Sequence, residues 1–186
     1  MAAVTPFPFT DVATGAWYFG DVYYAFNNAL FAGTSASTFE PELTMTRGML
    51  VTVLWRMEGS PKAAASSFTD AGGSWYSGAV DWAAANGIVK GYSDKVFAPN
   101  DTITREQMAA VLYRYASFKG IDVSAAKDLG GFADSASVSA YAKDAMSWAV
   151  AEGIINGADG KLLPAGGATR AQVAAILHRY IENCLF

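Results

Sequence analysis

The chain has 186 residues, of which 52% are hydrophobic and 16% are charged, and its formal net charge is −4. This composition is typical of a folded chain, and the acidic balance argues against nucleic-acid binding, which needs a basic surface. No apolar run reaches the roughly 18 residues of a membrane span, and the start of the chain shows no signal peptide, so we expect either a cytoplasmic protein or a piece of a longer, processed chain.

The first third of the chain predicts two helices. Residues 17–31 carry an approximate helical stripe of apolar side chains, and the loop over 33–43 contains Pro41, which prevents helix continuation. Thr46 is a suitable N-cap for the second helix, whose apolar residues recur at i, i+3, i+4 and i+7 from Leu50. This order of helix, loop and capped helix is the pattern that the rest of the chain follows.

The middle third shows the pattern most clearly. Residues 75–86 predict a helix, and Gly87 stands where a left-handed C-terminal cap is expected. Thr104 and Gln107 have the spacing of a capping box at the start of the next helix. The predicted buried stripe of that helix begins at Met108 and returns every three or four residues.

The last third repeats the same elements. Residues 141–152 predict a helix with Gly153 as its cap, and Thr169 with Gln172 forms a second capping box. The buried stripe of the final helix consists of Val173, Ile176, Leu177 and Tyr180. The three stripes match position for position.

Three copies of one motif therefore fill the chain. We place repeat 1 at 1–57, repeat 2 at 68–116 and repeat 3 at 132–186, joined by linkers at 58–67 and 117–131. One such unit is too small to bury the apolar stripe of its second helix. We therefore predict an all-α fold in which the three second helices form a central core with pseudo-threefold symmetry.

Each second helix carries two arginines nine positions apart, on opposite sides of the helix. The first of each pair lies in the first turn, where free backbone N–H groups and the helix dipole favour an anion. Two roles stay open for this arginine: binding a carboxylate or phosphate of a ligand, or pairing with a carboxylate such as Asp70. We interpret the second arginine as a partner of the last helix carbonyls. The pairs are Arg47 and Arg56, Arg105 and Arg114, and Arg170 and Arg179.

Aromatic residues at helical spacing also have two interpretations. Most such residues belong to a core, but sugars are bound by aromatic faces beside a few polar groups. An arginine at a helix start near aromatic rings would suit an acidic saccharide. The aromatic residues concerned are Trp17, Trp75, Trp82, Trp148, Tyr92 and Tyr141.

The sequence predicts neither an enzyme nor a cofactor or metal site. His178 is the only histidine, and it occupies the slot that Trp55 and Tyr113 fill in the other repeats, so no catalytic set is apparent. The acidic loop over 94–101 does not have the spacing of an EF-hand. Cys184 has no second cysteine with which to form a disulfide.

Repeat 2 carries a family resemblance. The motifs that carry it are Phe68-x-Asp70, Trp75, Trp82-Ala83, Gly87-Ile88-Val89-x-Gly91-Tyr92, Phe97-x-Pro99 and Ile103-Thr104-Arg105-Glu106-Gln107. In this order they resemble the S-layer homology (SLH) domain, and the resemblance covers about residues 9–57, 68–116 and 132–181. It implies a three-pronged all-α pseudo-trimer that anchors exported bacterial proteins non-covalently to the cell wall.

The resemblance also implies a ligand and a location. The family binds a secondary cell wall polysaccharide in grooves between neighbouring prongs, and this polymer often ends in a pyruvate ketal whose carboxylate suits an arginine. The expected place is the bacterial cell surface, outside the cell, with other surface-layer chains as a second class of partner. The candidate binding residues are the arginines Arg47, Arg105 and Arg170, the loop glycines Gly33, Gly91 and Gly157, the first-helix Asp81, and Trp17, Trp75, Trp82 and Trp148.

Repeats 1 and 3 depart from the family pattern. Tyr23 and Ser147 stand where repeat 2 has Asp81, and Ala29 stands where the other repeats have a glycine. We therefore hypothesise that not all three grooves bind, so that alanine at each of the three Thr-Arg arginines weakens binding unequally. The alternative function is a structural or protein–protein assembly module that has lost its sugar sites.

Overall fold

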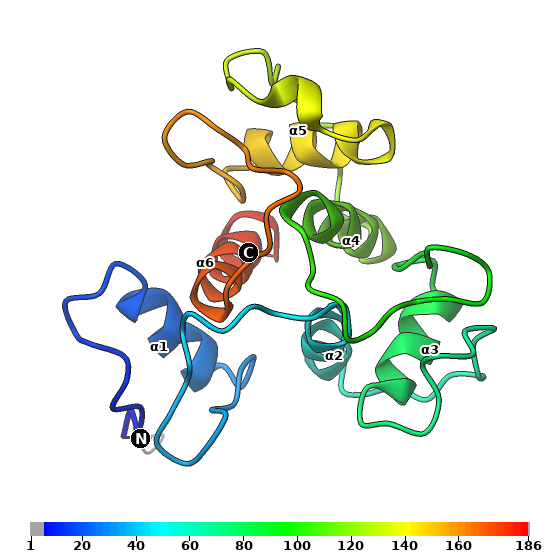
Figure 1. The fold of residues 1–186 in the computed structure, drawn as a ribbon, viewed down its shortest axis with the longest axis horizontal. Coiled ribbons are helices and arrows are strands. Elements are labelled where there is room, and N and C mark those ends of the chain that lie inside the picture. The colour runs from blue at the N-terminus through cyan, green and yellow to red at the C-terminus, as the bar shows by residue number, and fades with distance from the viewer. Residues whose placement is uncertain (1–5, 186) are drawn as a thin grey trace.

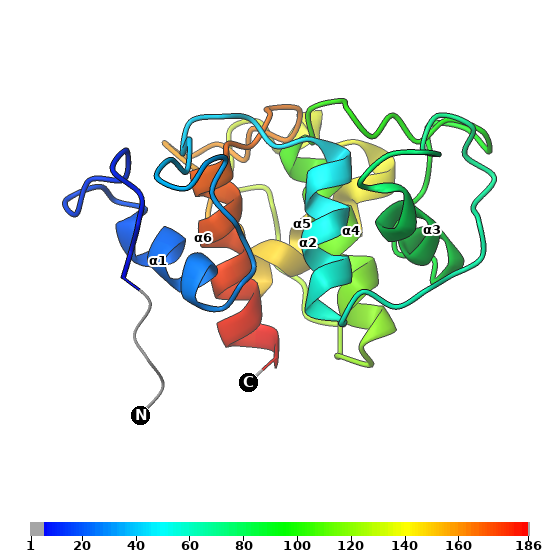
Figure 2. The ribbon, with the colours of Figure 1, turned by 90° about the horizontal axis from the view of Figure 1, so that it is seen from below.

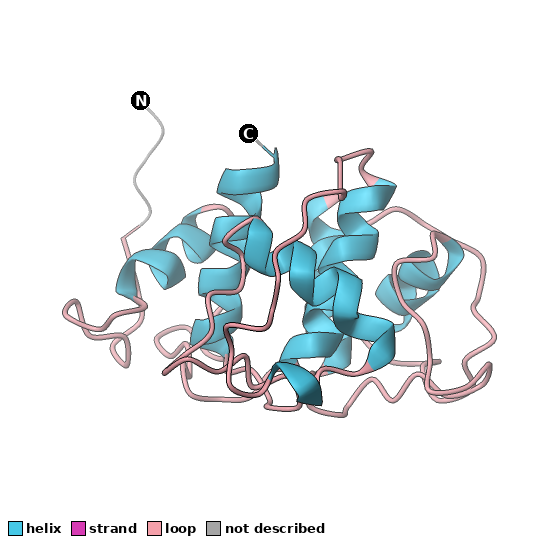
Figure 3. Cartoon of the chain, turned by 90° about the horizontal axis from the view of Figure 1, so that it is seen from above, coloured by secondary structure: helices cyan, strands magenta, loops and turns pink. Residues whose placement is uncertain are grey.

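The computed structural model describes residues 6–185, and within that range it contains α-helices, short 3-10 and π-helical turns and no β-strand (Figure 3). The α-helices are α1 (Phe19–Asn27), α2 (Arg47–Met57), α3 (Ser77–Ala85), α4 (Arg105–Phe118), α5 (Lys143–Ala151) and α6 (Arg170–Tyr180). The 3-10 helices η1 (Ser135–Ser137) and η2 (Ala140–Ala142) precede α5, and the π-helix η3 (Ile181–Leu185) follows α6. The all-α prediction is confirmed. Residues 1–5 and 186, which we assigned to repeats 1 and 3, lie outside the described residues.

The helices are arranged as an inner and an outer set. α2, α4 and α6 stand at the centre, and α1, α3 and α5 lie outside them (Figure 1). Each outer helix packs against the central helix of the preceding repeat: α3 on α2, α5 on α4, and α1 on α6. The repeats therefore interlock, and the contact of α1 with α6 joins the two ends of the chain.

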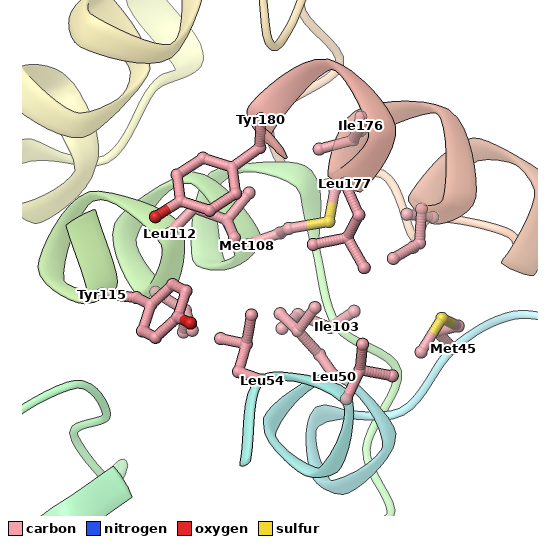
Figure 4. Close-up of a cluster of buried hydrophobic side chains, with 14 of the residues drawn as sticks. Met45, Leu50, Leu54, Ile103, Met108, Leu112, Tyr115, Ile176, Leu177 and Tyr180 are labelled. Atoms are coloured by element: carbon pink, nitrogen blue, oxygen red, sulfur yellow. The ribbon is translucent and has the colours of Figure 1, made fainter. Parts of the chain in front are cut away.

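The apolar stripes of the central helices meet in the middle of the molecule. Side chains from α2, α4 and α6 point toward one another there, and each is at most 1% exposed (Figure 4). They are Leu50, Leu54, Met108, Leu112, Tyr115, Leu177 and Tyr180. Since each repeat contributes one side of this core, none of the three has a complete core alone.

A ring of backbone hydrogen bonds joins the three segments that lead into the central helices. Met45 N donates to Ala168 O (2.9 Å), Ala168 N donates to Ile103 O (3.3 Å), and Ile103 N donates to Met45 O (2.9 Å). These segments lie together at one end of the molecule, opposite the C-terminal end of α6 (Figure 2). The ring fixes the starts of the central helices relative to one another.

The outer helices are shorter than the sequence predicted. α1 ends at Asn27 rather than near Phe31, because Ala29 adopts a left-handed conformation (φ 55°). Gly87 and Gly153 hold the equivalent positions in repeats 2 and 3, with φ values of 67° and 68°, so both predicted caps are confirmed. Alanine is strained in this conformation, where glycine is not.

We expect Ala29→Gly to raise the free energy of unfolding by about 0.5–1 kcal/mol, because relief of left-handed strain outweighs the added freedom of the unfolded chain. Urea unfolding followed by circular dichroism measures the change. The matched reverse substitution, Gly87→Ala, is expected to be destabilising by a similar amount. A loss of stability in Ala29→Gly would contradict this account.

An aspartate in each repeat holds the loop before the central helix. In repeat 2 the Asp70 carboxylate accepts hydrogen bonds from Phe97 N (2.9 Å) and Ala98 N (2.7 Å). Ala98 precedes Pro99 and has a positive φ of 57°, a strained conformation for alanine. Asp11 and Asp134 bind the equivalent amides of repeats 1 and 3. The carboxylate of the Phe-x-Asp motif therefore holds the loop in place, and among the described residues none of these three carboxylates forms an ion pair with a Thr-Arg arginine.

The contact of Asp70 with the loop predicts an acid-sensitive contribution to stability. Burial opposes ionisation of Asp70, but the two backbone N–H donors outweigh it and lower the pKa of this carboxyl. A lowered pKa stabilises the fold above the unfolded pKa of roughly 4, and this contribution is lost as pH falls below that value. We expect Asp70→Asn to cost about 1 kcal/mol at pH 7, because this carboxylate is exposed, and little at pH 2. Urea midpoints measured from pH 2 to 7 test this; a cost independent of pH would contradict it.

Candidate functional site

A cavity beside the central helices has a volume of about 680 Å³, and we call it groove A. All three repeats line it: α2 of repeat 1, the loop and α4 of repeat 2, and the start of repeat 3. Its lining residues are Arg47, Val51, Val89, Lys90, Gly91, Tyr92, Phe97, Ile103, Glu106, Gln107, Ala110, Val111, Arg114 and Tyr141. A site of this composition offers cationic groups, aromatic rings and backbone edges to a ligand.

Arg47 forms one end of groove A and binds the loop of the next repeat. Its Nε donates to Phe97 O (2.8 Å) and its Nη2 to Lys90 O (3.1 Å). Its guanidinium also lies 4.7 Å from the ring centroid of Tyr92 and 4.6 Å from that of Phe97. The side chain is 6% exposed, and burial lowers the pKa of its guanidinium. Arg47 therefore has a structural role, because its contacts join repeat 1 to the loop of repeat 2.

Arg170 makes the corresponding contacts between repeats 3 and 1. It donates to Phe39 O (2.7 Å) and Ala32 O (2.8 Å), and its guanidinium lies over the Phe39 ring. Arg105 differs: its Nη2 donates to the side chain of Gln172 (2.8 Å) and its Nη1 to Gly167 O (3.3 Å). Repeat 3 has a shorter loop, and Leu162 stands where the other repeats have a phenylalanine, so its loop presents no aromatic face to Arg105.

The starts of the central helices are not free to bind an anion, so that part of the sequence prediction is wrong. In α2, Arg47 N donates to Asp101 O (2.9 Å) and Gly48 N to Pro99 O (2.8 Å). The first two amides of α4 and α6 likewise donate to carbonyls of the following repeat. The predicted Thr caps and both capping boxes are confirmed, and they satisfy the amide at the third helical position. Neighbouring repeats therefore satisfy the amides that the sequence analysis left open.

Arg114, the second arginine of α4, has a position that sequence reasoning missed, whereas Arg56 and Arg179 do lie in the last turn of α2 and α6. α4 continues to Phe118, so Arg114 lies before the last turn, and its interpretation as a partner of the last carbonyls is wrong. It lines groove A, where burial and then the nearby Arg47 lower the pKa of its guanidinium. The two arginines of one helix do face opposite ways, but arginines of successive repeats share one groove. The nine-residue spacing of the two arginines was the sequence feature that could have indicated this, because it places them on opposite sides of the helix and so in different grooves.

Glu106 ties groove A to repeat 3. Its carboxylate accepts hydrogen bonds from Ser139 N (2.9 Å), Ser139 Oγ (2.7 Å) and the Tyr141 hydroxyl (3.2 Å). Glu106 is 8% exposed, whereas Tyr141 is 55% exposed, and both line groove A. Burial and the adjacent carboxylate raise the pKa of Tyr141 to about 12. No sequence signal marked Glu106, because its equivalents are Gly48 and Ala171.

Arg105 heads a second, smaller cavity of about 200 Å³, which we call groove B. It lies between repeats 2 and 3, and Trp17 of repeat 1 completes its wall. Arg179 occupies the place that Arg114 has in groove A, and its Nη1 donates to Ile154 O (3.4 Å). Grooves A and B therefore share one arrangement. Two repeats supply the arginines, and the remaining repeat supplies an aromatic ring: Tyr141 in groove A and Trp17 in groove B.

The three loop glycines lie where the backbone leaves no room for a side chain. A Cβ on Gly91 would lie 2.4 Å from Ser93 O and from Val96 O, and one on Gly33 would lie 2.3 Å from Ser35 O. Gly157 is similarly enclosed, 2.6 Å from Lys161 O. These glycines shape the loops, and Gly91 and Gly157 also line grooves A and B. A ligand role for them stays a prediction.

Asp81 is not brought together with the arginines. It accepts a hydrogen bond from Ser66 N (2.8 Å) and lines a separate cavity of about 640 Å³ between residues 64–68 and α3. Neither groove A nor groove B includes it. Its contacts are those of a residue that fixes the linker to repeat 2.

The four candidate tryptophans fall into two classes. Trp17 and Trp75 are 64% and 57% exposed, and Trp17 lies beside Arg105 in groove B. Trp82 and Trp148 are 3% and 0% exposed, so neither has a face free for a sugar. Their assignment to a binding site is corrected here: both belong to the aromatic packing around the central helices.

This arrangement has a counterpart among known proteins. The model of the S-layer homology domain matches the chain three times, at residues 8–48, 67–109 and 131–174. The chain belongs to the S-layer homology domain family. The SLH matches fall on the three predicted repeats, and each includes the Thr-Arg pair of its repeat.

Several relatives are larger proteins. An endoglucanase of Bacillus sp. (strain KSM-635) is 34% identical over 92% of this chain and 18% of its own length. The surface-layer 125 kDa protein of Lysinibacillus sphaericus is 33% identical over 81% of the chain and 13% of its own length. A cellulosome-anchoring protein of Acetivibrio thermocellus is 28% identical over 57% of the chain and 25% of its own length.

The chain thus corresponds to a small part of these relatives, and the shared part is the SLH segment. Enzymes and surface-layer proteins both carry it, and the family match with the surface relatives supports a cell-surface anchoring module. Among residues 6–185, no helix is long and apolar enough to pass through a bilayer.

Proposed function

We propose that this SLH module attaches a larger bacterial surface protein to the cell wall by binding an acidic secondary cell wall polysaccharide in the grooves between its repeats. Groove A carries the proposal. It brings two guanidinium groups and the rings of Tyr92 and Tyr141 around one cavity of about 680 Å³. The volume is in the range of sites that take small ligands such as a few sugar units.

The chemistry of the groove suits an acidic saccharide. Guanidinium groups bind carboxylates through paired hydrogen bonds, and the faces of Tyr92 and Tyr141 offer apolar surfaces to a sugar ring. A pyruvate ketal, with one carboxylate on a sugar ring, has the combination of charge and shape that the groove offers.

The proposed role is non-catalytic. The shared SLH segment is a small fraction of the enzymes that carry it, which supports a module that localises other domains. The proposed location is the outer cell surface, where the module holds its parent protein. Other surface-layer chains are proposed as a second class of partner.

Co-sedimentation with purified Gram-positive cell walls tests this function. We expect the chain to pellet with walls from the organisms of the surface-layer and cellulosome-anchoring relatives, and to stay in solution after acid extraction of the wall polysaccharide. Binding that survives extraction would point to peptidoglycan and overturn the polysaccharide proposal. Absence of binding to all these walls would favour the alternative assembly module.

A further inference from the structure

The two arginines of groove A differ in what they already bind. We propose that Arg114 binds the acidic group of the saccharide, and that Arg47 is a positioning residue that holds the repeat 2 loop in the wall of the groove. This inference rests on the proposed function and assigns a carboxylate-bearing ligand to one residue in one groove. The sequence suggested the opposite division of roles.

Arg47 has little capacity left for a ligand. Its Nε and Nη2 already donate to carbonyls of the repeat 2 loop, and Tyr92 and Phe97 lie against its guanidinium. With 6% of its surface exposed, it is enclosed by the protein. Its charge remains in the wall of the groove and adds to the local positive potential.

Arg114 has its donors free. It forms no hydrogen bond or ion pair with any residue that the structure describes, although it is half-buried in the groove wall. The one carboxylate in the lining, Glu106, is already occupied by Ser139 and Tyr141. Two partly desolvated cations therefore share groove A without a free counter-charge, an arrangement that an anionic ligand group stabilises.

Groove B also contains two half-buried arginines, but both already donate hydrogen bonds to the protein. Arg105 donates to Gln172 within the groove, and Arg179 donates to Ile154 O. The cavity there is about 200 Å³, less than a third of groove A. Selection for the acid is therefore assigned to groove A, because the arginines of groove B already donate to neutral acceptors and its cavity is smaller.

The test is calorimetric titration of the full chain with wall polysaccharide released from the organisms used above. The polymer is compared in three forms: native, carboxyl-reduced to neutral alcohols, and freed of phosphodiesters. We expect carboxyl reduction to weaken binding by roughly ten- to hundred-fold and phosphate removal to leave it unchanged. Arg114→Gln is expected to weaken binding of the native polymer to the same extent and to abolish its difference from the reduced polymer.

Three control variants separate the acid-binding role from general damage. Arg56→Gln, a change outside both grooves, is expected to alter affinity less than about two-fold. Arg179→Gln, the matched change in groove B, is expected to keep the difference in affinity between native and carboxyl-reduced polymer. Arg114→Lys keeps the charge and is expected to retain part of the discrimination. Thermal unfolding of each variant shows whether the fold is intact.

Each outcome decides between the two proposals. Equal binding of native and carboxyl-reduced polymer, or an Arg114→Gln variant that still distinguishes them, overturns the role of Arg114 while wall binding keeps the proposed function. A loss of this distinction in Arg179→Gln overturns the assignment to groove A. If affinity falls with phosphate removal instead, the ligand group is a phosphate and the carboxylate assignment is wrong. A chain that binds neither walls nor polymer overturns both proposals.

Discussion

Arg47→Ala is expected to lower the free energy of unfolding by roughly 2–4 kcal/mol. Two charge-assisted hydrogen bonds to loop carbonyls disappear, and the contacts of the guanidinium with Tyr92 and Phe97 are lost with them. Because Phe97 is buried, its carbonyl then has no partner close by. Arg170→Ala is expected to cost about as much, since Arg170 makes the equivalent contacts with repeat 1.

Arg105→Ala is expected to cost less, about 1 kcal/mol, although each of the three arginines follows the N-cap threonine of its helix. Its main partner is the flexible side chain of Gln172, which water can satisfy, and no aromatic ring covers it. Urea unfolding followed by circular dichroism measures all three variants. Arg56→Ala, an exposed arginine on α2, is the matched control and is expected to change stability by less than about 0.5 kcal/mol.

Arg47→Lys separates charge from geometry. A lysine keeps the positive charge but cannot donate to Phe97 O and Lys90 O together from a planar fork, so most of the loss is expected to remain. Full recovery in the lysine variant would mean that charge alone stabilises the contact. An Arg105→Ala variant as unstable as Arg47→Ala would contradict the difference that we draw between the repeats. These stabilities are also needed to interpret the unequal binding losses that the sequence led us to expect.

The parts of the fold that were predictable are those encoded within a few residues. Thr104 and Gln107 form a capping box through local geometry, and the helical period identifies the buried stripe from Met108 onward. Gly87 marks the helix end for the same reason. In repeat 1 the capping glycine is replaced by Ala29, and the end of α1 was therefore predicted a few residues too late. The periodicity of three such units was sufficient for the all-α fold.

The parts that were not predictable depend on which repeat lies next to which. α3 packs on α2 of the preceding repeat, and nothing within either helix specifies this exchange. Arg47 looked like a ligand-binding residue because the loop carbonyls that it binds are about fifty positions later in the chain. Arg114 looked like a helix-end residue because α4 continues further, to Phe118, than the sequence indicated. A role that depends on contacts between repeats can be assigned only when the spatial arrangement of the repeats is known, and the motif alone does not give it.

Glu106→Ala is expected to lower the free energy of unfolding by roughly 2–3 kcal/mol, the second large effect. Three donors from repeat 3 lose their acceptor, and Ser139 N is one of the amides at the start of η2. Glu106→Gln keeps the shape and one acceptor oxygen, so about 1 kcal/mol is expected for it. Glu42→Ala, an exposed glutamate before α2, is the control and is expected to be neutral.

The same change is expected to reduce wall binding as well as stability, because Tyr141 reaches groove A while bound to Glu106. Tyr141→Phe keeps the ring and removes one of the three hydrogen bonds, so its stability cost is expected to be small and its binding close to normal. Co-sedimentation at a temperature where all variants are folded separates the two effects. If Glu106→Ala binds walls as well as the native chain does, groove A does not depend on repeat 3. If Glu106→Ala weakens wall binding while Tyr141→Phe binds normally, repeat 3 contributes the position of the Tyr141 ring. That result would explain why three repeats surround a groove that two of them could enclose.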